Sequence, residues 1–494
     1  MAQEKSHFDD VNKYVSNTDR DIYTVSNIPE EVVAVIFAYV SRSPKGFREN
    51  IDTVIQEEQL GQERAAKFHE KWVLNYGHAS VAEHAAVHVG VERVSRLFSS
   101  VLELSNEYMS FTEYSQRYQK PVKGDFYIPE ELSDKPSLKN DFVELNNYLY
   151  DTYSKLNDTL FEYLKDTVPT PQGSEERIHF RALEKLAFED ARYVLSLATF
   201  TNLGLTANAR AIEDSLTKLL SSKYPEVRNR AVEIKNEVRF SVPTLVKYAN
   251  VNEYIVETRG ELEAIASSLN EGNKEGSLED GPSVNLLDWT GKGSENAEEI
   301  ALDNIVKAIL FEHSDLSYDA IEKKLGDKDI SGKLEMLKKA VEKLGKFDNP
   351  INAFKLVQYK AEFVISEACW HQLLRHRKTD WIYKEPGVSD GITMPPNVHS
   401  AGIGDDLRAA VKESENLYQR LREEELPLTA SYVVTNAHNR RLMGSFDLWE
   451  LFHLVNLRMS EGAQWDIKNV TRTLADKIGR YHPNLVAPAL GRIE

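Results

Sequence analysis

The most constraining feature of this 494-residue chain is a strand-like segment that leads directly into a helix signal and then into a basic cluster. Apolar and polar residues alternate from Val357 to Ile365, which is the period of a half-buried strand. Ser366 follows at an N-cap position, so we predict a helix that runs into Arg375-His376-Arg377-Lys378. On such a helix, Gln372, Arg375 and His376 would share one face.

Four basic side chains this close together repel one another, so the cluster implies an anionic partner or compensating carboxylates. The simpler alternative is a solvated helix end, where Arg and Lys favour the negative pole of the helix dipole. The net charge of -18 argues against general nucleic-acid or acidic-membrane binding, because such binding needs a broad positive surface. A small phosphorylated ligand held by a few arginines is compatible with this charge.

A complementary version of the pattern occurs earlier in the chain. The stretch Gly77–His84 reads G-H-A-S-V-A-E-H, and a strand-like segment at 85–91 and a helical segment at 93–107 follow it. The stretch Ser110–Tyr118 then reads S-F-T-E-Y-S-Q-R-Y. The chain therefore contains two related segments of similar order.

These segments resemble the flavin-dependent thymidylate synthases, whose motif has the form R-H-R-x-x-S-x-x-x-x-S-x-R-Y after a G-H-x-[ST]-x-x-E-H element. The chain is similar to two such domains in tandem, with the motif divided between them. The first copy keeps the G-H element and the later motif residues but has Ser105-Asn106-Glu107 in place of R-H-R. The second copy keeps Arg375–Arg377 but has acidic residues at the serine positions and Gly387 in place of the later arginine.

The same division recurs towards the end of each copy. Arg192 and Asn208-Ala209-Arg210 resemble the family's phosphate arginine and its N-A-R flavin contact. The second copy has Glu423 at the place of Arg192, which leaves Gly444–Phe452 as an apparent insertion. Conversely, Asn456-Leu457-Arg458, followed by Gln464-Trp465-Asp466-Ile467, resembles the family's C-terminal element. In the first copy, the matching stretch Leu219-Leu220-Ser221-Ser222 lacks the arginine.

The expected fold class is α+β, with two tandem related domains that each consist of a sheet flanked by helices. We expect a first domain at 1–267, a polar, glycine-bearing linker at 268–282, and a second domain at 283–494. Neither a G-x-G-x-x-G nor a G-x-x-x-x-G-K-[ST] sequence occurs, so a Rossmann or P-loop fold has no motif support.

The resemblance implies an FAD-dependent thymidylate synthase that methylates dUMP to dTMP with methylenetetrahydrofolate and NADPH. Arg458 would be the catalytic residue, stabilising charge on the pyrimidine as N3 loses its proton. The implied cofactor-binding residues are His78, Ser80, Glu113, Asn208, Arg210, Arg375, His376 and Arg377. The implied substrate-binding residues are Glu113, Tyr114, Ser115, Gln116, Arg117, Arg192, Gln372, Arg375 and Arg458.

The resemblance also implies a composite site, because members of the family build each site where subunits of a tetramer meet. The first copy retains Arg117 and Arg192, and the second retains Arg375 and Arg458. We expect one complete site per two-domain chain and a homodimer that forms a tetramer-like assembly. Whether the site forms within one chain or between chains stays open here.

Several alternatives remain at this point. The chain could methylate another uridylate, or it could be a catalytically inactive nucleotide-binding or flavin-binding tandem. A metal-dependent hydrolase using His78, His84 and His88 is a further alternative. We predict no metal site, because two histidines four apart on a strand lie roughly 13 Å apart. Cys369 is expected to be a small buried apolar residue rather than a nucleophile.

The expected location is cytoplasmic. The sequence has one cysteine, which precludes an internal disulfide and favours an intracellular setting. No apolar run is long enough to span a bilayer, and the first six residues do not begin a secretory signal. We therefore expect no membrane or nucleic-acid partner.

Overall fold

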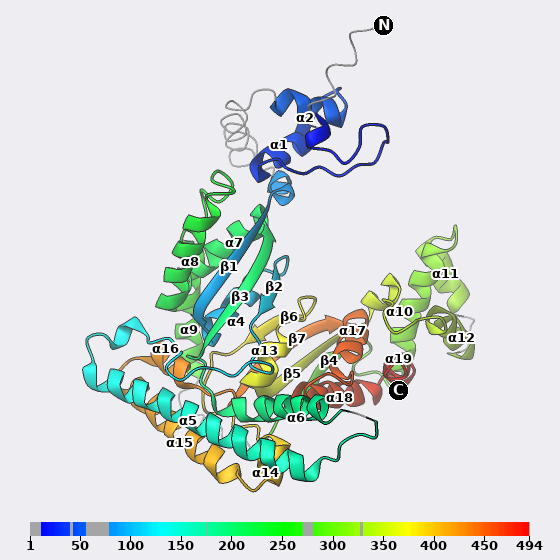
Figure 1. Ribbon diagram of the computed structural model, residues 1–494. Coiled ribbons are helices and arrows are strands. Elements are labelled where there is room, and N and C mark those ends of the chain that lie inside the picture. The colour runs from blue at the N-terminus through cyan, green and yellow to red at the C-terminus, as the bar shows by residue number, and fades with distance from the viewer. Residues whose placement is uncertain are drawn as a thin grey trace. The chain divides into compact units, whose positions relative to one another are not determined.

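The computed structural model describes residues 11–39, 43–55, 79–173, 175–269, 280–326 and 330–493. It divides into two compact units (Figure 1). The first comprises Met1–Tyr114 and Phe200–Lys274, and the second comprises Ser115–Thr199 and Glu275–Glu494. No described helix is both long enough and apolar enough to cross a membrane.

The first unit contains an antiparallel sheet of three strands in the order β1-β3-β2. These strands are β1 (Ala86–Ser95), β3 (Phe200–Asn208) and β2 (Ser110–Glu113). Alternate side chains such as Val87 and Leu205 are buried. Three helices pack on the strands: α4 (Arg96–Leu104), α7 (Ala209–Leu220) and α8 (Pro225–Val238).

The remaining described elements of the first unit are helical. A separate apolar cluster around Val35, Ile36 and Ile51 holds η1 (Val11–Lys13), α1 (Glu30–Tyr39) and α2 (Phe47–Ile55) together. The 3-10 helix η3 (Ala79–His84) leads into β1. Helix α9 (Glu253–Leu269) has no buried residue.

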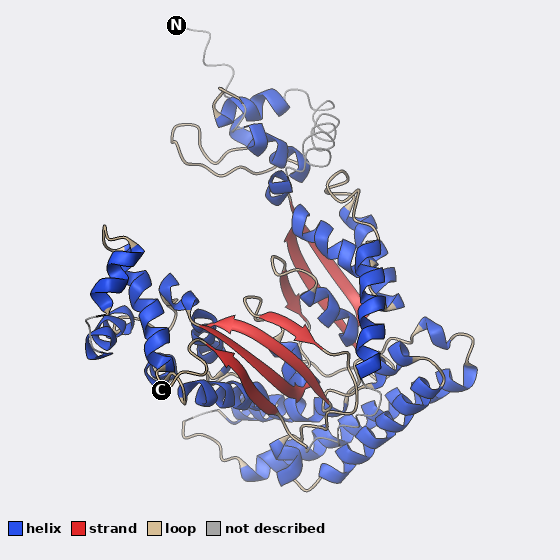
Figure 2. Ribbon diagram, turned by 180° about the vertical axis from the view of Figure 1, so that it is seen from behind, coloured by secondary structure: helices blue, strands red, loops and turns tan. Residues whose placement is uncertain are grey.

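The second unit contains an antiparallel four-stranded sheet in the order β4-β5-β7-β6 (Figure 2). The strands are β4 (Ser283–Trp289), β5 (Gln358–Ser366), β7 (Asn439–Asp447) and β6 (Asp380–Tyr383). Helix α13 (Glu367–Leu373) follows β5, and α17 (Leu448–Arg458) follows β7. Helices α18 (Trp465–Gly479) and α19 (Pro483–Leu490) pack on α17. The last turn of α17 and the end of α13 are the elements that position the basic cluster.

Longer helices complete the second unit. Helix α5 (Pro136–Thr167) packs against α6 (Glu176–Ala191) and α15 (Gly404–Glu423). Helix α10 (Ala297–Glu312) packs against α11 (Tyr318–Leu325) and α12 (Ile330–Val341). The short elements are η4 (Glu130–Leu132), η5 (Arg192–Val194), η6 (Asn352–Leu356), α14 (Pro396–Ser400), α16 (Pro427–Ala430) and η7 (Ser431–Val433).

The two sheets belong to repeats of one pattern. In each repeat a long strand ends at a serine that caps the following helix, Ser95 for α4 and Ser366 for α13. Each serine hydroxyl also donates to a carboxylate in the first turn of a later helix, at 2.6 Å to Glu226 and 2.5 Å to Asp466. The expected α+β class, with two related sheets flanked by helices, is confirmed.

Three details differ from the sequence-based expectation. Residues 115–199 pack with the second compact unit rather than the first, so the units are not two consecutive stretches of chain. Helix α13 ends at Leu373, so the arginines lie in the turn that follows it. The segment Gly444–Phe452 is the end of β7 and the start of α17, not an insertion.

This last correction also changes the internal alignment. Asn208 and Asp447 both cap the helix that follows the long central strand. Counting back sixteen residues from each reaches Arg192 and Ser431, which begin η5 and η7. Ser431, not Glu423, is therefore the counterpart of Arg192. Most of the linker expected at 268–282 lies outside the described residues, and the two sequence domains remain a prediction.

Candidate functional site

The turn between α13 and β6 carries the basic cluster. Ser366 starts α13 by accepting a hydrogen bond from the backbone N–H of Cys369 at 2.9 Å. After the helix ends, the backbone N–H of His376 still donates to the carbonyl of Leu373 at 3.0 Å. This turn exposes Arg375 and Arg377 and buries His376 between them.

Arg458, the last residue of α17, reaches this turn from the other side. Its Nε donates to Nε2 of His376 at 2.8 Å, and one terminal nitrogen donates to the carbonyl of Gln372 at 2.7 Å. Burial, reinforced by the charge of Arg375, lowers the pKa of Arg458 to about 10. The guanidinium is therefore a charged group at neutral pH whose two hydrogen bonds go to neutral acceptors.

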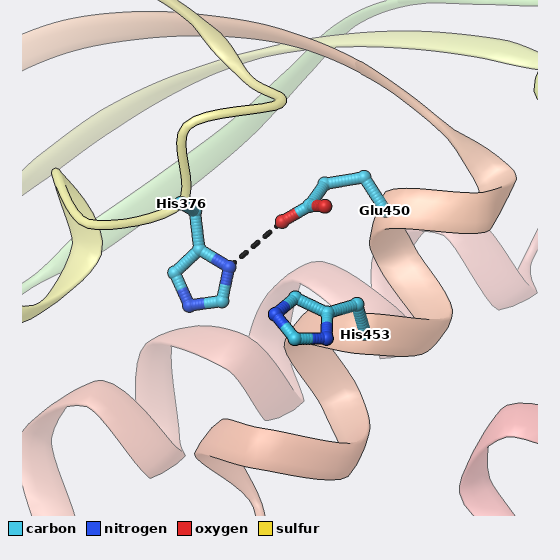
Figure 3. A group of neighbouring side chains, drawn as sticks. All are labelled: His376, Glu450 and His453. Atoms are coloured by element: carbon cyan, nitrogen blue, oxygen red, sulfur yellow. Dashed lines mark hydrogen bonds and ion pairs between the residues drawn. The ribbon is translucent and has the colours of Figure 1, made fainter. Parts of the chain in front are cut away.

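His376 also contacts a carboxylate. Its Nδ1 lies 2.7 Å from Oε1 of Glu450, at the third position of α17 (Figure 3). Both side chains are almost fully buried, with exposed fractions of 1% and 3%. Burial, and then the charge of Arg458, lowers the pKa of His376 to about 3, so the ring is neutral at physiological pH. The sequence analysis did not identify Glu450.

A buried polar chain joins residues from both halves of the sequence. Gln372 donates to Gln464 at 2.7 Å, and Gln464 donates to the hydroxyl of Tyr193 at 2.9 Å. That hydroxyl donates to Asp466 at 2.7 Å, which also accepts from Ser366. Gln464 is therefore more than core packing, and the two motif halves meet within the second unit.

The two arginines retained from the first half also lie in this unit. Arg117 donates through Nε to Glu189 at 2.5 Å and through a terminal nitrogen to the carbonyl of Gly462 at 3.0 Å. Buried Arg192 donates to the backbone carbonyl of Glu189 at 3.3 Å. The charge of Arg117 contributes to the lowered pKa of Arg458. Arg117, although paired with Glu189, is thus close enough to Arg458 to act on it electrostatically.

Gln116 supplies a buried donor in the same region. Its side chain is 3% exposed, and its carbonyl oxygen accepts from Asn436 at 3.2 Å. Its Nε2 has no hydrogen-bond partner among the described residues. Asn436 also donates to the carbonyl of Arg192 at 2.9 Å and was missed by the sequence analysis. It lies just before β7, and no motif marked it.

Several predicted residues belong to the first unit and have local partners there. Glu113 forms a buried ion pair with Arg96 at 2.6 Å, and the backbone N–H of Tyr114 donates to Asn202 at 2.8 Å. Asn208 caps α7, and exposed Arg210 pairs with Glu83 at 2.5 Å. Ser80 is exposed in η3, while His78 lies outside the described residues. Their flavin and nucleotide roles remain predictions.

The histidines considered for a metal site have other contacts. His84 stacks on Phe37 with 4.8 Å between ring centroids, and Nδ1 of His88 lies 2.8 Å from the hydroxyl of Thr206. In the described part of the chain, a different group, His376, Glu450 and His453, places its ligand atoms within 4.8 Å of one another. The sequence analysis did not anticipate this group.

Cys369 is fully buried, as expected. Burial raises the pKa of its thiol well above the ordinary value, which disfavours the nucleophilic thiolate. A route that attacks the pyrimidine with a cysteine therefore has no support from this residue.

A hollow of about 410 Å³ is lined by residues of β1, β2 and β3. Its lining includes His88, Gly90, Ser110, Thr112, Gly204 and Thr206. None of the predicted site residues lines it, so it is not part of the candidate site.

Comparison with known proteins places these features in a family. The family model described as thymidylate synthase complementing protein matches residues 23–244 and 305–484. A UPF0159 protein of Chlamydia muridarum is 25% identical over 498 residues, covering 95% of this chain and 92% of that relative. A flavin-dependent thymidylate synthase of Clostridium tetani is 30% identical over 223 residues, covering 45% of this chain and 82% of that relative.

A solved structure was also matched. It is a UMP/dUMP methylase, PolB, from Streptomyces cacaoi bound with 5-Br dUMP, with 15% identity and a TM-score of 0.35. The match covers 44% of this chain and 99% of that chain. Because the family model matches two segments that together span most of the sequence, the chain belongs to the thymidylate synthase complementing protein family.

Proposed function

We propose that this chain is an FAD-dependent thymidylate synthase that converts dUMP to dTMP. Methylenetetrahydrofolate would supply the carbon and NADPH the reducing equivalents. The observation that carries the proposal is the half-buried guanidinium of Arg458, whose described hydrogen bonds go only to the neutral acceptors His376 and Gln372. A partly desolvated cation whose hydrogen bonds go to neutral partners favours a ligand that develops negative charge.

The proposed role of Arg458 is to stabilise the pyrimidine as N3 loses its proton. A guanidinium suits this role because it keeps its charge and presents several donors in a fixed plane. The lowered pKa of about 10 leaves it cationic near neutrality. Gln372, whose carbonyl holds Arg458, would also contact the nucleotide.

The remaining donors suit the phosphate and the ring. We propose that Arg117 and Arg192 bind the dUMP phosphate, since arginine binds phosphate through parallel hydrogen bonds. The buried Nε2 of Gln116 is a donor that a pyrimidine carbonyl could satisfy. Tyr114 and Ser115, on the same segment, remain proposed substrate contacts.

The donor set also fits a flavin dinucleotide. Arg375 and Arg377 are exposed cations on one turn, as an anionic diphosphate requires. When bound, FAD would supply the hydride chemistry of the reduction. We keep His78, Ser80, Glu113, Asn208 and Arg210 as proposed flavin contacts.

We further propose that the part of the site around Arg117, Arg192 and Arg458 forms within one chain. Arg117 bonds to the carbonyl of Gly462, four residues after Arg458, inside one compact unit. Co-assembled Arg117→Ala and Arg458→Ala chains should therefore stay inactive in every mixture. Recovery of activity on mixing would place the site between chains of the proposed homodimer.

The direct test is an assay with dUMP, methylenetetrahydrofolate, FAD and NADPH, scored for dTMP. The purified protein should also show bound-flavin absorbance. Formation of a methylated product from UMP alone would assign a different uridylate. Bound flavin without any product would indicate an inactive nucleotide-binding or flavin-binding tandem, and neither flavin nor product would overturn the proposal.

A further inference from the structure

Glu450, His376 and Arg458 form a hydrogen-bonded chain. Oε1 of Glu450 lies 2.7 Å from Nδ1 of His376, and Nε2 of the same ring accepts from Nε of Arg458 at 2.8 Å. Glu450 and His376 are both buried. The contacts join α17 to the turn after α13 at two points, one near each end of the helix.

The direction of each hydrogen bond follows from the chemistry of the groups. The Nε of an arginine is always a donor, so Nε2 of His376 must carry a lone pair. A neutral imidazole then has its proton on Nδ1, which donates to Glu450. Only an acceptor oxygen at position 450 completes this arrangement, and an ionised carboxylate offers two.

We propose that Glu450 is a positioning residue that, together with Arg458, holds His376 as the Nδ1–H tautomer and thereby aims the guanidinium of Arg458 at the substrate. The part that concerns substrate rests on the function proposed above. The tautomer is a property of the protein alone. Glu450 itself touches neither substrate nor cofactor in this scheme.

The first repeat supports a specific role. Aligning the helix caps Asn208 and Asp447 places Ala211 opposite Glu450 and Leu219 opposite Arg458. The first repeat therefore lacks both the counterpart of Glu450 and the counterpart of Arg458. Glu450 and Arg458 are separated by eight residues on α17 and do not contact each other directly, so His376 is their link.

The charge of Glu450 depends on its surroundings. Burial raises its pKa to about 7, while cationic neighbours oppose this shift. The titratable and charged groups near it are His376, Lys378, Asp447, His453 and Arg458. Above about pH 7 the carboxylate is ionised and accepts from His376. Below that pH a protonated carboxyl is a competing donor, so turnover should rise with pH across this range.

A divalent metal ion held by His376, Glu450 and His453 is the competing explanation of this cluster. The ion would replace the Nδ1 proton of His376 while Arg458 donates to the other nitrogen of the same ring. Arg458 and Lys378 both act on Glu450 as positive charges. Their repulsion of a dication favours the proton over the metal.

The first test reads the tautomer without any assay. Full-length protein labelled with 15N at histidine, with the His376 signals assigned by comparison with His376→Gln, should show His376 as the Nδ1–H form. Glu450→Gln should keep that form, because an amide oxygen also accepts. Glu450→Ala should give a mixed or broadened His376 signal. An Nε2–H tautomer in the wild type would overturn the proposal, as would one equivalent of bound zinc by elemental analysis.

The second test reads turnover. Glu450→Ala should lower kcat roughly 100-fold with little change in KM for dUMP, since a misdirected catalytic group costs about this much. Glu450→Gln should recover most of kcat and lose the pH dependence near 7. Exposed Glu413→Gln on α15 serves as the control. Unchanged kcat and pH profile in Glu450→Ala contradicts the proposal. A wild type without dTMP but with the Nδ1–H tautomer overturns only the proposed function.

Discussion

The two repeats share a sheet-and-helix scaffold but differ in the charged side chains that follow the first helix, α4 or α13. After α4, Asn106 and Lys218 both donate to Asp214, at 2.8 and 2.7 Å, and Lys218 also donates to the carbonyl of Ser105. After α13, the corresponding place holds His376 and Arg458, and the cation there is met by neutral acceptors. The first arrangement neutralises its own charge, and the second leaves charge for a ligand. If the proposed function is right, the repeat that kept a cation without a direct carboxylate partner is the one that acts on the substrate.

The strongest test of this difference between the repeats is to remove the guanidinium of Arg458. Arg458→Ala should reduce dTMP formation on the order of 1000-fold, because a half-buried donor with a proposed role at the developing charge is lost. Bound flavin should stay, as measured by absorbance of the folded protein. Exposed Arg472→Ala on α18 is the matched control. Leu219→Arg, which restores an arginine to the first repeat, should not rescue the variant, since that repeat lacks the R-H-R turn.

A second comparison concerns ion pairs of opposite polarity at the start of equivalent helices. Arg96 opens α4 and pairs with Glu113, whereas Glu367 opens α13 and pairs with Arg440 at 2.7 Å. Arg96→Met and Glu367→Gln should each cost about 3–5 kcal/mol in urea unfolding, because each leaves a buried charge alone.

The exposed pair of Lys412 and Glu415 provides the control for this comparison. Lys412→Met should cost less than about 1 kcal/mol. If the buried and exposed variants lost equal free energies of unfolding, the ion pairs at the helix starts would not owe their effect to burial.

The exposed arginines of the second repeat, Arg375 and Arg377, should matter for flavin binding. Arg375→Ala or Arg377→Ala should each weaken FAD binding by about 1.5–3 kcal/mol, the usual range for a charge-assisted hydrogen bond. Thermal unfolding of the apoprotein should be unchanged, because both side chains lie on the surface. Flavin binding by Arg210→Ala, measured in the same way, tests the proposed flavin contact of the first repeat. Full flavin occupancy in a folded Arg375→Ala, Arg377→Ala double variant would contradict the assignment.

The smallest expected effect is a pH dependence of stability. Burial lowers the pKa of His438 to about 4, and its Nδ1 accepts from the backbone N–H of Thr435 at 2.9 Å. The unfolded chain takes up the proton first, so the contribution of His438 to stability falls as pH drops below about 6.5, by about 2 kcal/mol at pH 5. His438→Asn keeps an acceptor and should remove this contribution, while that of buried His376 stays. Exposed His313→Asn should leave both contributions unchanged.

The local sequence predicted where strands and helices begin, but it did not predict which distant side chains would contact one another. Alternation and the Ser366 cap predicted β5 and the start of α13, because both signals are local. The end of α13 was missed because Leu374 to Lys378 contain no glycine or proline to mark a stop. Glu450 was missed because its partner His376 is 74 residues away, and only the fold brings them together.

The same limit applies to the internal alignment. Placing Glu423 opposite Arg192 required an insertion at Gly444–Phe452, which looked plausible because the repeats share few residues there. The helix caps Asn208 and Asp447 give the correct register, since a cap marks a physical boundary. The helix caps therefore identified equivalent positions in the two repeats better than the matches to the family motif did.

The hydrogen bond between Tyr193 and Asp466 has a consequence for how the protein is made. The two residues are 273 positions apart, so the polar chain through Gln464 cannot close until α18 has been synthesised. At translation rates of about 5–20 residues per second, the nascent chain waits roughly 14–55 seconds with Tyr193 unpaired. Closure across so long a loop is entropically costly and tends to be slow. A chain that ended before α18 would thus contain Arg117, Arg192 and Arg458 but could not form the polar chain through Gln464.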